Sequence, residues 1–183
     1  MKKLFVTAFA LLAMACASET YAQKNPMVGG AAMYNTKDIV DNAVNSKDHT
    51  TLVAAVKAAG LVETLKSAGP FTVFAPTNAA FDKLPEGTVA TLVKPENKAT
   101  LTKILTYHVL AGRFSAADVM AAIKKGDGKA TFTTVQGGKL YASVDDGKVK
   151  LWDENGGTAY VTIADVNQKN GVIHVIDSVV TPK

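Results

Sequence analysis

Three histidines are the side chains of this sequence whose chemistry is best suited to catalysis or metal binding. His108 lies in the apolar stretch ILTYHVLAG, His174 lies in GVIHVIDSVV, and His49 lies in SKDHTT. Imidazole is a common metal ligand and exchanges protons near neutral pH. However, no HxH, HxxxH or histidine–carboxylate spacing joins the three residues, so the pattern does not predict a shared metal site.

The spacing around His108 predicts a buried position. Leu101, Leu105 and His108 recur at i, i+4 and i+7, so they share one face of a predicted helix, with Tyr107 to the side of that face. A buried imidazole needs hydrogen-bond partners. We therefore expect a structural role for His108, and we expect His108→Ala to cost about 1–3 kcal/mol of folding free energy.

His174 lies in a segment with the alternation of a β-strand. On a strand, Asp177 points to the opposite face, and Ser178 lies on the same face but about 13 Å further along. A hydrogen bond requires about 3 Å, which excludes a local Ser-His-Asp triad. His174 is therefore also predicted to be structural.

No other constellation predicts an active site. The pairs Asp145–Asp146 and Asp153–Glu154 fall in predicted turns, where we expect them to be solvated. The Gly-Gly pairs lack the strand-to-helix context of a phosphate-binding loop. We therefore predict a protein that is not an enzyme and that has no cofactor and no metal.

The N-terminus has the pattern of a secretory signal peptide. Two lysines precede a short apolar run over residues 4–16, and small residues before Gln23 favour cleavage after Ala22. The alternative is a lipoprotein acylated at Cys16, which is less well matched because Met14 is bulky. We expect a secreted or periplasmic protein with residues 1–22 removed and no transmembrane segment after cleavage.

The composition of the chain argues against a nucleic-acid partner and against a disulfide bond. The chain of 183 residues has a net charge of +4, and its basic residues are scattered lysines with a single arginine, Arg113. Nucleic-acid binders usually carry a continuous basic stripe, so no nucleic-acid partner is expected. Cys16 is the one cysteine, and signal cleavage would leave no thiol for a disulfide.

The remaining residues predict one α+β domain. Residues 23–35 form an N-terminal arm, either exposed or packed on the domain. Helical spacing begins near Thr36 and returns in several segments, one of which is expected to run to Gly112. A strand is expected at residues 71–74, followed by a helix with Thr77 as N-cap, and Ser115 with Asp118 has the spacing of a capping box.

After Gly126 the hydrophobic period changes from about 3.6 to 2. Five strand candidates follow, separated by turn signals at Gly137–Gly138, Asp146–Gly147 and Gly156–Gly157. The order of helices followed by strands predicts an antiparallel sheet after the helices.

Three blocks of the chain resemble the fasciclin (FAS1) domain family. They are GPFTVFAPTNAAFDKLP (69–85), LTYHVLAGRF (105–114) and NGVIHVIDSVVTP (170–182), in the order and spacing of that family. The resemblance covers about residues 36–181 and is greatest to small, secreted, single-domain bacterial members. It implies a β-sheet wedge packed against several helices, and roles in adhesion or extracellular protein recognition.

The resemblance also indicates site residues. Tyr107–His108 matches a tyrosine–histidine motif linked to receptor binding in animal members, and Asp165–Val166 falls at a second such motif but without its flanking Pro and Met. Within the three blocks we expect structural roles for Thr77, His108, His174 and Asp177.

Two functions remain open at this stage. The first is an exported binding module whose partner is an extracellular or cell-surface protein, with possible self-association to supply a second binding event. The second is a soluble carrier or enzyme with a pocket between helices and sheet. The arm and the edge of the helix at Tyr107 are the expected binding surfaces.

Overall fold

The computed structural model describes residues 25–183. The predicted signal peptide, residues 1–22, lies outside the described residues. The described helices are α1 (Ile39–Ala43), α2 (Thr50–Ala59), α3 (Val62–Lys66), α4 (Asn78–Asp82), α5 (Thr88–Leu92), α6 (Lys98–Tyr107) and α7 (Ala116–Lys125), with short 3-10 turns at Lys47–His49 and Pro95–Asn97. The strands are β1 (Met27–Val28), β2 (Ala31–Ala32), β3 (Phe71–Pro76), β4 (Val109–Ala111), β5 (Ala130–Thr133), β6 (Lys139–Asp145), β7 (Lys148–Trp152), β8 (Thr158–Gln168) and β9 (Gly171–Ile176).

Strands β3 to β9 form one sheet, in the order β4-β3-β9-β8-β7-β6-β5. An isolated bridge between Leu110 and Thr134 joins the two ends, so the sheet curls almost into a barrel. The five strands predicted after Gly126 all form. The prediction of a purely antiparallel sheet is wrong, because β9 pairs in parallel with β3. Two strands from the helical half of the sequence therefore complete the sheet.

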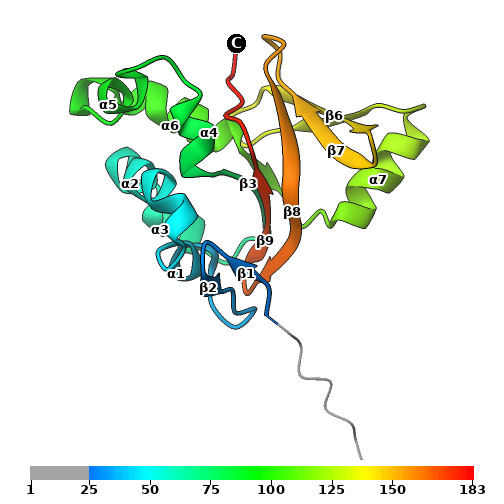
Figure 1. Cartoon of the computed structure of the whole chain (residues 1–183), viewed down its shortest axis with the longest axis horizontal. Helices are drawn as coiled ribbons and strands as arrows, with labels where there is room; N and C mark the ends of the chain where they lie inside the picture. Colours follow the sequence, from blue (N-terminus) through cyan, green and yellow to red (C-terminus); the bar gives the residue numbers. More distant parts are fainter. Residues whose placement is uncertain (1–24) are drawn as a thin grey trace, which may run out of the picture.

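The sheet separates two hydrophobic cores, with α1 to α6 on one side of it and α7 on the other (Figure 1). Ile173 and Val175 of β9 face the core of the N-terminal arm and helices α1 to α6. Ile176 of β9 and Phe74 of β3 face the second core, which α7 covers together with strands β5 to β8. All six residues of β9 are buried, because this strand has a core on each face. The mixed α+β class is confirmed.

Capping residues set the N-terminal ends of several helices. Thr77 is the N-cap of α4, and Ser115 and Asp118 form the predicted capping box of α7. The predicted start near Thr36 is wrong, because Asp38 accepts the hydrogen bond from the Asp41 backbone and is the N-cap of α1. An Asp at this position satisfies a helix N–H group that would otherwise lack a partner.

The helix that was expected to reach Gly112 ends at Tyr107. His108 is its C-cap, and residues 109–111 form β4 instead. The Phe74 backbone N–H of β3 donates to the His108 carbonyl, and Val109 pairs with Val73. Pairing with an existing strand edge therefore replaces the last predicted turn of helix. In the interior of the sheet, β9 ends at Ile176, so residues 177–180, which continue the strand spacing of GVIHVIDSVV, lie outside it.

The N-terminal arm packs on the domain. Its described part is a hairpin of β1 and β2, in which Val28 and Met33 are buried against the helical core. The turn needs glycine at position 29, where φ is +57° and a Cβ atom would approach Ser46 Oγ to 2.3 Å. The Gly29 carbonyl accepts a hydrogen bond from the Lys47 N–H, which holds the hairpin against the 3-10 turn Lys47–His49.

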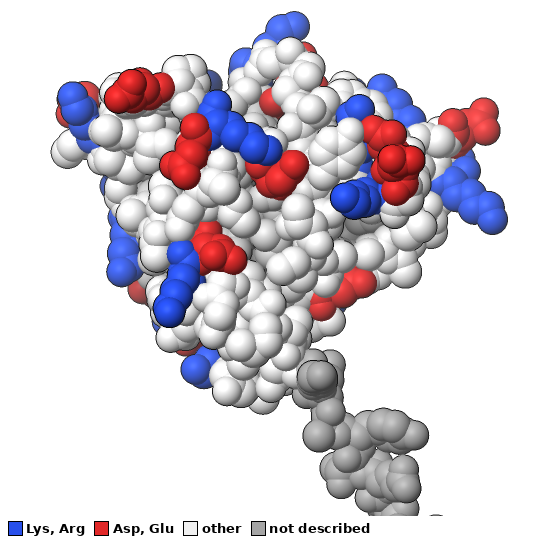
Figure 2. Space-filling view, viewed as in Figure 1, with Lys and Arg blue, Asp and Glu red and all other residues white. Residues whose placement is uncertain are grey.

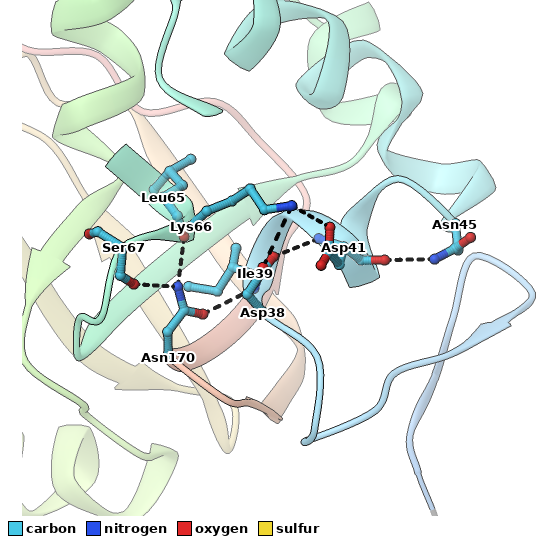
Figure 3. A network of polar contacts seen from close by, with 8 residues as sticks. All are labelled: Asp38, Ile39, Asp41, Asn45, Leu65, Lys66, Ser67 and Asn170. Carbon is cyan, nitrogen blue, oxygen red and sulfur yellow. Dashed lines mark hydrogen bonds and ion pairs between the residues drawn. The ribbon is translucent and has the colours of Figure 1, made fainter. Parts of the chain in front are cut away.

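One asparagine joins the helical layer to the turn between β8 and β9. The side chain of Asn170 accepts a hydrogen bond from the Ile39 N–H at 3.0 Å and donates to the carbonyls of Leu65 (2.7 Å) and Ser67 (2.9 Å) (Figure 3). Three of the four hydrogen bonds available to the amide are thus made to backbone groups from α1 and the end of α3. The sequence pattern Asn-Gly predicted only a turn here.

Substitution of Asn170 tests this connection. We expect Asn170→Ala to lower the free energy of unfolding by about 2–4 kcal/mol, because it leaves three buried or partly buried backbone groups without partners. Urea denaturation monitored by circular dichroism measures the change. Asn45→Ala is the matched control, because Asn45 is exposed and its side chain donates to the Asp41 carbonyl alone; we expect it to cost less than about 0.5 kcal/mol. Equal effects of the two substitutions would contradict the connection.

Candidate functional site

His108 is buried at the end of α6, and both of its ring nitrogens have partners. Nδ1 lies 2.8 Å from the Ile104 carbonyl, and Nε2 lies 3.3 Å from the Val180 backbone nitrogen. A backbone N–H only donates, so Nε2 is the acceptor and Nδ1 carries the proton. Burial lowers the pKa of His108 to about 4. The ring is therefore neutral at physiological pH.

His174 is buried in β9 and stacks on Phe74 of β3, with ring centroids 5.7 Å apart. Its Nδ1 accepts a hydrogen bond from the Asp165 N–H at 3.3 Å, and its Nε2 lies 2.8 Å from the Phe114 carbonyl and donates to it. Burial lowers the pKa of this imidazole as well. His174 is thus neutral in the opposite tautomer to His108, and it connects β8 to the loop before α7.

The two histidines have no free nitrogen for chemistry. Each ring donates to one carbonyl and accepts from one backbone N–H, so a substrate or a metal ion would have to displace a backbone hydrogen bond. Within residues 25–183, no group of three or more His, Cys, Asp or Glu side chains is arranged to hold a metal ion. The arrangement of His108 and His174 serves the scaffold.

Tyr107 does not lie at an exposed edge, and that prediction is wrong. Its side chain is fully buried in the core beside α7, and its hydroxyl donates to the Lys139 carbonyl at 2.5 Å. Burial raises the pKa of Tyr107 to about 12. Gly138 makes room for the ring, because a Cβ atom at that position would lie 2.8 Å from it. Tyr107 therefore presents no surface to a partner.

In the second motif, Asp165–Val166, the aspartate is exposed to solvent and the valine is buried in the core. Val166 is 1% exposed and pairs with Ile173 in the helical core. Asp165 is exposed, with φ of +57°, at an irregularity in β8, and its carboxylate accepts a hydrogen bond from the Ala116 N–H at 2.7 Å. Its side chain thus holds the start of α7, while its backbone N–H holds His174.

The structure joins Asp165 to His174 by a hydrogen bond, whereas the side chains of Tyr107 and His108 bond to other segments. The side chains of Tyr107 and His108, at the end of α6, point in different directions. Tyr107 reaches β6, and His108 reaches the C-terminal segment. Of the other predicted structural residues, Asp177 accepts hydrogen bonds from the Tyr160 N–H and the Ser178 hydroxyl. Its pKa is lowered, because these hydrogen bonds and Lys83 outweigh the opposing effect of burial.

Asp153 was expected to be solvated in a turn, and the structure corrects this expectation. The residue is 2% exposed, and its carboxylate accepts hydrogen bonds from the N–H groups of Asn155, Gly157 and Thr181. It therefore closes the turn between β7 and β8 and holds the C-terminal segment one residue beyond the Val180 N–H bound by His108. Only the short sequence distance to Gly157 hinted at an Asx-type turn.

Arg113 also has a structural position that the sequence did not indicate. Its guanidinium donates to the Asn167 side chain at 3.0 Å and to the Gln168 carbonyl at 2.9 Å. These contacts attach the loop between β4 and α7 to the C-terminal end of strand β8. The signal that could have identified it is that it is the one arginine in the chain.

The neutral state of His108 predicts a dependence of stability on pH. The ordinary pKa of 6.5 applies to the unfolded chain, so the unfolded state takes up a proton below pH 6.5, whereas the folded state does so only near pH 4. The free energy of unfolding should therefore fall by about 3 kcal/mol from this residue as the pH falls from 7 to 4. His49 and His174 act in the same direction.

Two measurements check this prediction. The NMR resonances of the His108 ring should keep their neutral positions down to about pH 5, and a midpoint near pH 6.5 would contradict the burial argument. At pH 7, His108→Ala should lower the free energy of unfolding by about 1–3 kcal/mol, because the Ile104 carbonyl and the Val180 N–H lose their partner. Thermal and urea denaturation measure it; unchanged stability would contradict a scaffold role.

Comparison with known proteins places these features in a family. The family model for the fasciclin domain matches residues 47–182. Protein sll1483 of Synechocystis sp. is 46% identical over 179 residues, which cover 97% of this chain and 92% of that protein. Immunogenic protein MPB70 of Mycobacterium bovis is 38% identical over 168 residues, covering 88% and 78% of the two chains. Cell surface glycolipoprotein MPB83 of the same species is 36% identical over 178 residues, covering 94% and 72%.

A solved structure supports the fold. The FAS1 domain pair of the insect cell adhesion molecule fasciclin I aligns with a TM-score of 0.69 at 17% identity. The alignment covers 78% of this chain and 50% of the insect chain, so the chain spans about half the length of that domain pair. Within residues 25–183, no helix is long and apolar enough to cross a membrane. The family match, the relatives and the near-closed sheet agree, and the chain belongs to the fasciclin domain family.

Proposed function

We propose that this protein is an exported, non-enzymatic binding module that recognises a protein at the cell surface or outside the cell. The names of two relatives support the location, because MPB83 is a cell surface glycolipoprotein and the insect structure comes from a cell adhesion molecule. The use of both ring nitrogens of His108 and His174 in backbone hydrogen bonds supports recognition over catalysis.

The observation that carries the proposal is the surface of the N-terminal arm. Of the six large apolar side chains that are exposed among residues 25–183, Met27 and Tyr34 belong to the arm, and Val44 belongs to the end of α1 that the arm contacts. Met27 is 60% exposed. Figure 1 places the β1–β2 hairpin in the lower part of the molecule, and Figure 2, in the same view, shows few charged side chains there. Apolar side chains exposed on the hairpin and on the helix end beside it offer a protein partner apolar surface to bury.

The arm is held rigidly enough to present these side chains. The Tyr34 backbone exchanges two hydrogen bonds with the Asn42 side chain, at 3.0 and 2.7 Å, and Val28 and Met33 anchor the hairpin in the core. A rigid surface loses less conformational entropy on binding than a flexible one. We name the three exposed side chains Met27, Tyr34 and Val44 the arm surface.

An affinity capture tests this surface. The protein, purified after expression of the full chain, is used to capture partners from envelope and culture-supernatant fractions. We expect the double variant Met27→Ser/Tyr34→Ser to reduce capture of a specific partner by at least about tenfold, because two exposed apolar contacts are lost. Both side chains are exposed, so the fold should be preserved, which circular dichroism verifies.

Met120→Ser is the matched control. Met120 is 49% exposed, but it lies on α7, on the other side of the sheet from the arm. We expect it to retain the partner at the wild-type level. Capture that survives the double variant, or that is lost equally with Met120→Ser, would show that recognition does not use the arm surface.

Self-association belongs to the same proposal, because a single binding face cannot join two surfaces. Two copies that associate through a face other than the arm surface would present two arm surfaces. Light scattering coupled to size-exclusion chromatography measures this state. A strict monomer at all concentrations would leave the module as a monovalent ligand for its partner.

A further inference from the structure

The side chains of strands β5 to β8 alternate between two faces of the sheet. Those on one face, such as Leu140 and Leu151, pack in the core that α7 covers. Those on the other face are exposed or partly exposed to solvent where the four strands pair with one another. We name this solvent side of the four strands the outer face. Three of its side chains are aromatic, although aromatic rings gain much free energy from burial in a core.

The strand register aligns one row of side chains across the outer face. Tyr141 of β6 pairs with Thr131 of β5 and with Trp152 of β7. Trp152 pairs in turn with Thr158 of β8. Neighbouring strands lie about 4.8 Å apart, so this row of four side chains is about 14 Å long. The row therefore fits a short stretch of a chain molecule better than a single small one.

The two rings in the middle of the row form a flat platform. Tyr141 and Trp152 stack with their centroids 5.6 Å apart and their planes 23° from parallel. Such a cross-strand pair stabilises the sheet by itself. Both rings are nevertheless partly exposed, and they lie between two exposed threonines. The pair thus offers aromatic surface to a ligand from solvent.

A lysine ammonium group lies over this platform. Lys129 Nζ is 4.2 Å from the centroid of the Tyr141 ring and 5.3 Å from that of Trp152. The negative faces of the rings attract the ammonium group and hold it there. Lys129 has no ion-pair partner among residues 25–183. The platform therefore presents a positive charge that a negative group of a ligand can neutralise.

The next row of the outer face repeats the arrangement. Lys150 pairs with Ser143 and with Tyr160, and its ammonium group lies 5.7 Å from the centroid of the Tyr160 ring. Here Asp145 neutralises the charge at 3.3 Å. Lysines outnumber this single outward carboxylate of the strand pairs, because Lys139 and Lys148 also point to the outer face. The acidic residues Asp146 and Glu154 lie in the turns at the two ends of β7.

These features match a carbohydrate chain that carries carboxylates. The C–H face of a sugar ring packs on the negative face of an aromatic ring. Serine and threonine hydroxyls exchange hydrogen bonds with sugar hydroxyls, and an ammonium group pairs with a carboxylate. A single-stranded nucleic acid also stacks on aromatic rings, but it needs a cationic groove along its phosphates. The one arginine of the chain is not available for such a groove, because Arg113 is bound to Asn167 and Gln168.

We propose that the outer face of β5 to β8 binds an acidic polysaccharide whose sugar rings carry carboxylates. A sugar ring lies on the platform of Tyr141 and Trp152, and its carboxylate pairs with Lys129. Figure 1 places β6 and β7 in the upper part of the molecule and the β1–β2 hairpin in the lower part. The outer face is therefore a second binding surface, which goes beyond protein recognition by the arm surface and is tested separately from it.

The fluorescence of Trp152 reports on this face directly, because it is the one tryptophan of the chain. Oligomers of galacturonate are the probe, and the same oligomers with methyl-esterified carboxylates are the matched uncharged probe. We expect a saturable change in fluorescence, with the acid bound at least about tenfold more tightly than the ester. Lys129→Gln should remove this difference between the probes. Tyr141→Ser should weaken the binding of both probes by about tenfold, while circular dichroism verifies the fold of each variant.

Lys103→Gln is the control variant, because Lys103 is an exposed lysine on α6, which packs in the helical core on the other side of the sheet. It should bind both probes as the wild-type protein does. Absence of saturable binding of galacturonate oligomers, equal affinity for acid and ester, or an equal loss in Lys103→Gln would overturn the proposal. Tighter binding of an oligothymidylate of the same charge would also overturn it, because the platform would then bind bases in preference to sugars.

Discussion

The parallel pairing of β3 with β9 is the constraint on which the rest of the structure depends. Phe71 pairs with Gly171 and the register continues to Pro76 and Ile176, so two segments about a hundred residues apart lie side by side. Parallel neighbours require a crossover connection, and here all other helices and strands of the domain lie within that crossover or before it. Gly171 permits the approach, because a Cβ atom there would lie 2.2 Å from the Phe71 carbonyl.

The central strand pair explains why the buried polar residues lie where they do. Where strands and helices end or become irregular, backbone groups lack partners, and a side chain must supply each one. Asn170, before β9, does this for the start of α1 and the end of α3. His174 does it at the irregularity of β8, and His108 with Asp153 does it for the consecutive N–H groups of Val180 and Thr181 after β9. The imidazoles serve because a neutral ring offers one donor and one acceptor in a rigid geometry.

Local features of this fold could be predicted from the sequence, whereas the long-range arrangement could not. The caps at Thr77 and Ser115 and the turn at Asp146–Gly147 depend on neighbouring residues alone, and the structure contains them. The strand β4 was missed because Val109 and Leu110 continue the helical spacing of α6, and only the edge of β3 makes them a strand. The resemblance to the fasciclin family predicted the fold, whereas hydrophobic periodicity alone predicted only helices followed by a sheet.

The misplacement of Tyr107 has a specific physical cause. The helical-face argument assumes one buried face, but the end of α6 lies between two cores. Leu101 and Leu105 pack in the helical core, while Tyr107 packs in the core beside α7. A residue beside the first face therefore becomes fully buried. The burial of Asp165 and Val166 could not be predicted from the sequence pattern for a similar reason. The exposure of Asp165 depends on an irregularity in β8 that the spacing of residues did not indicate.

The arm joins the surface of the molecule to its interior. Alternation along the hairpin points Val28 and Met33 toward the helical core, while Met27 and Tyr34 face solvent. The exposed side chains of the arm surface are thus neighbours in the chain of the buried side chains that anchor the hairpin. Because Val28 and Met33 fix the hairpin through their packing, the position of Met27 and Tyr34 depends on the packing of the helical core.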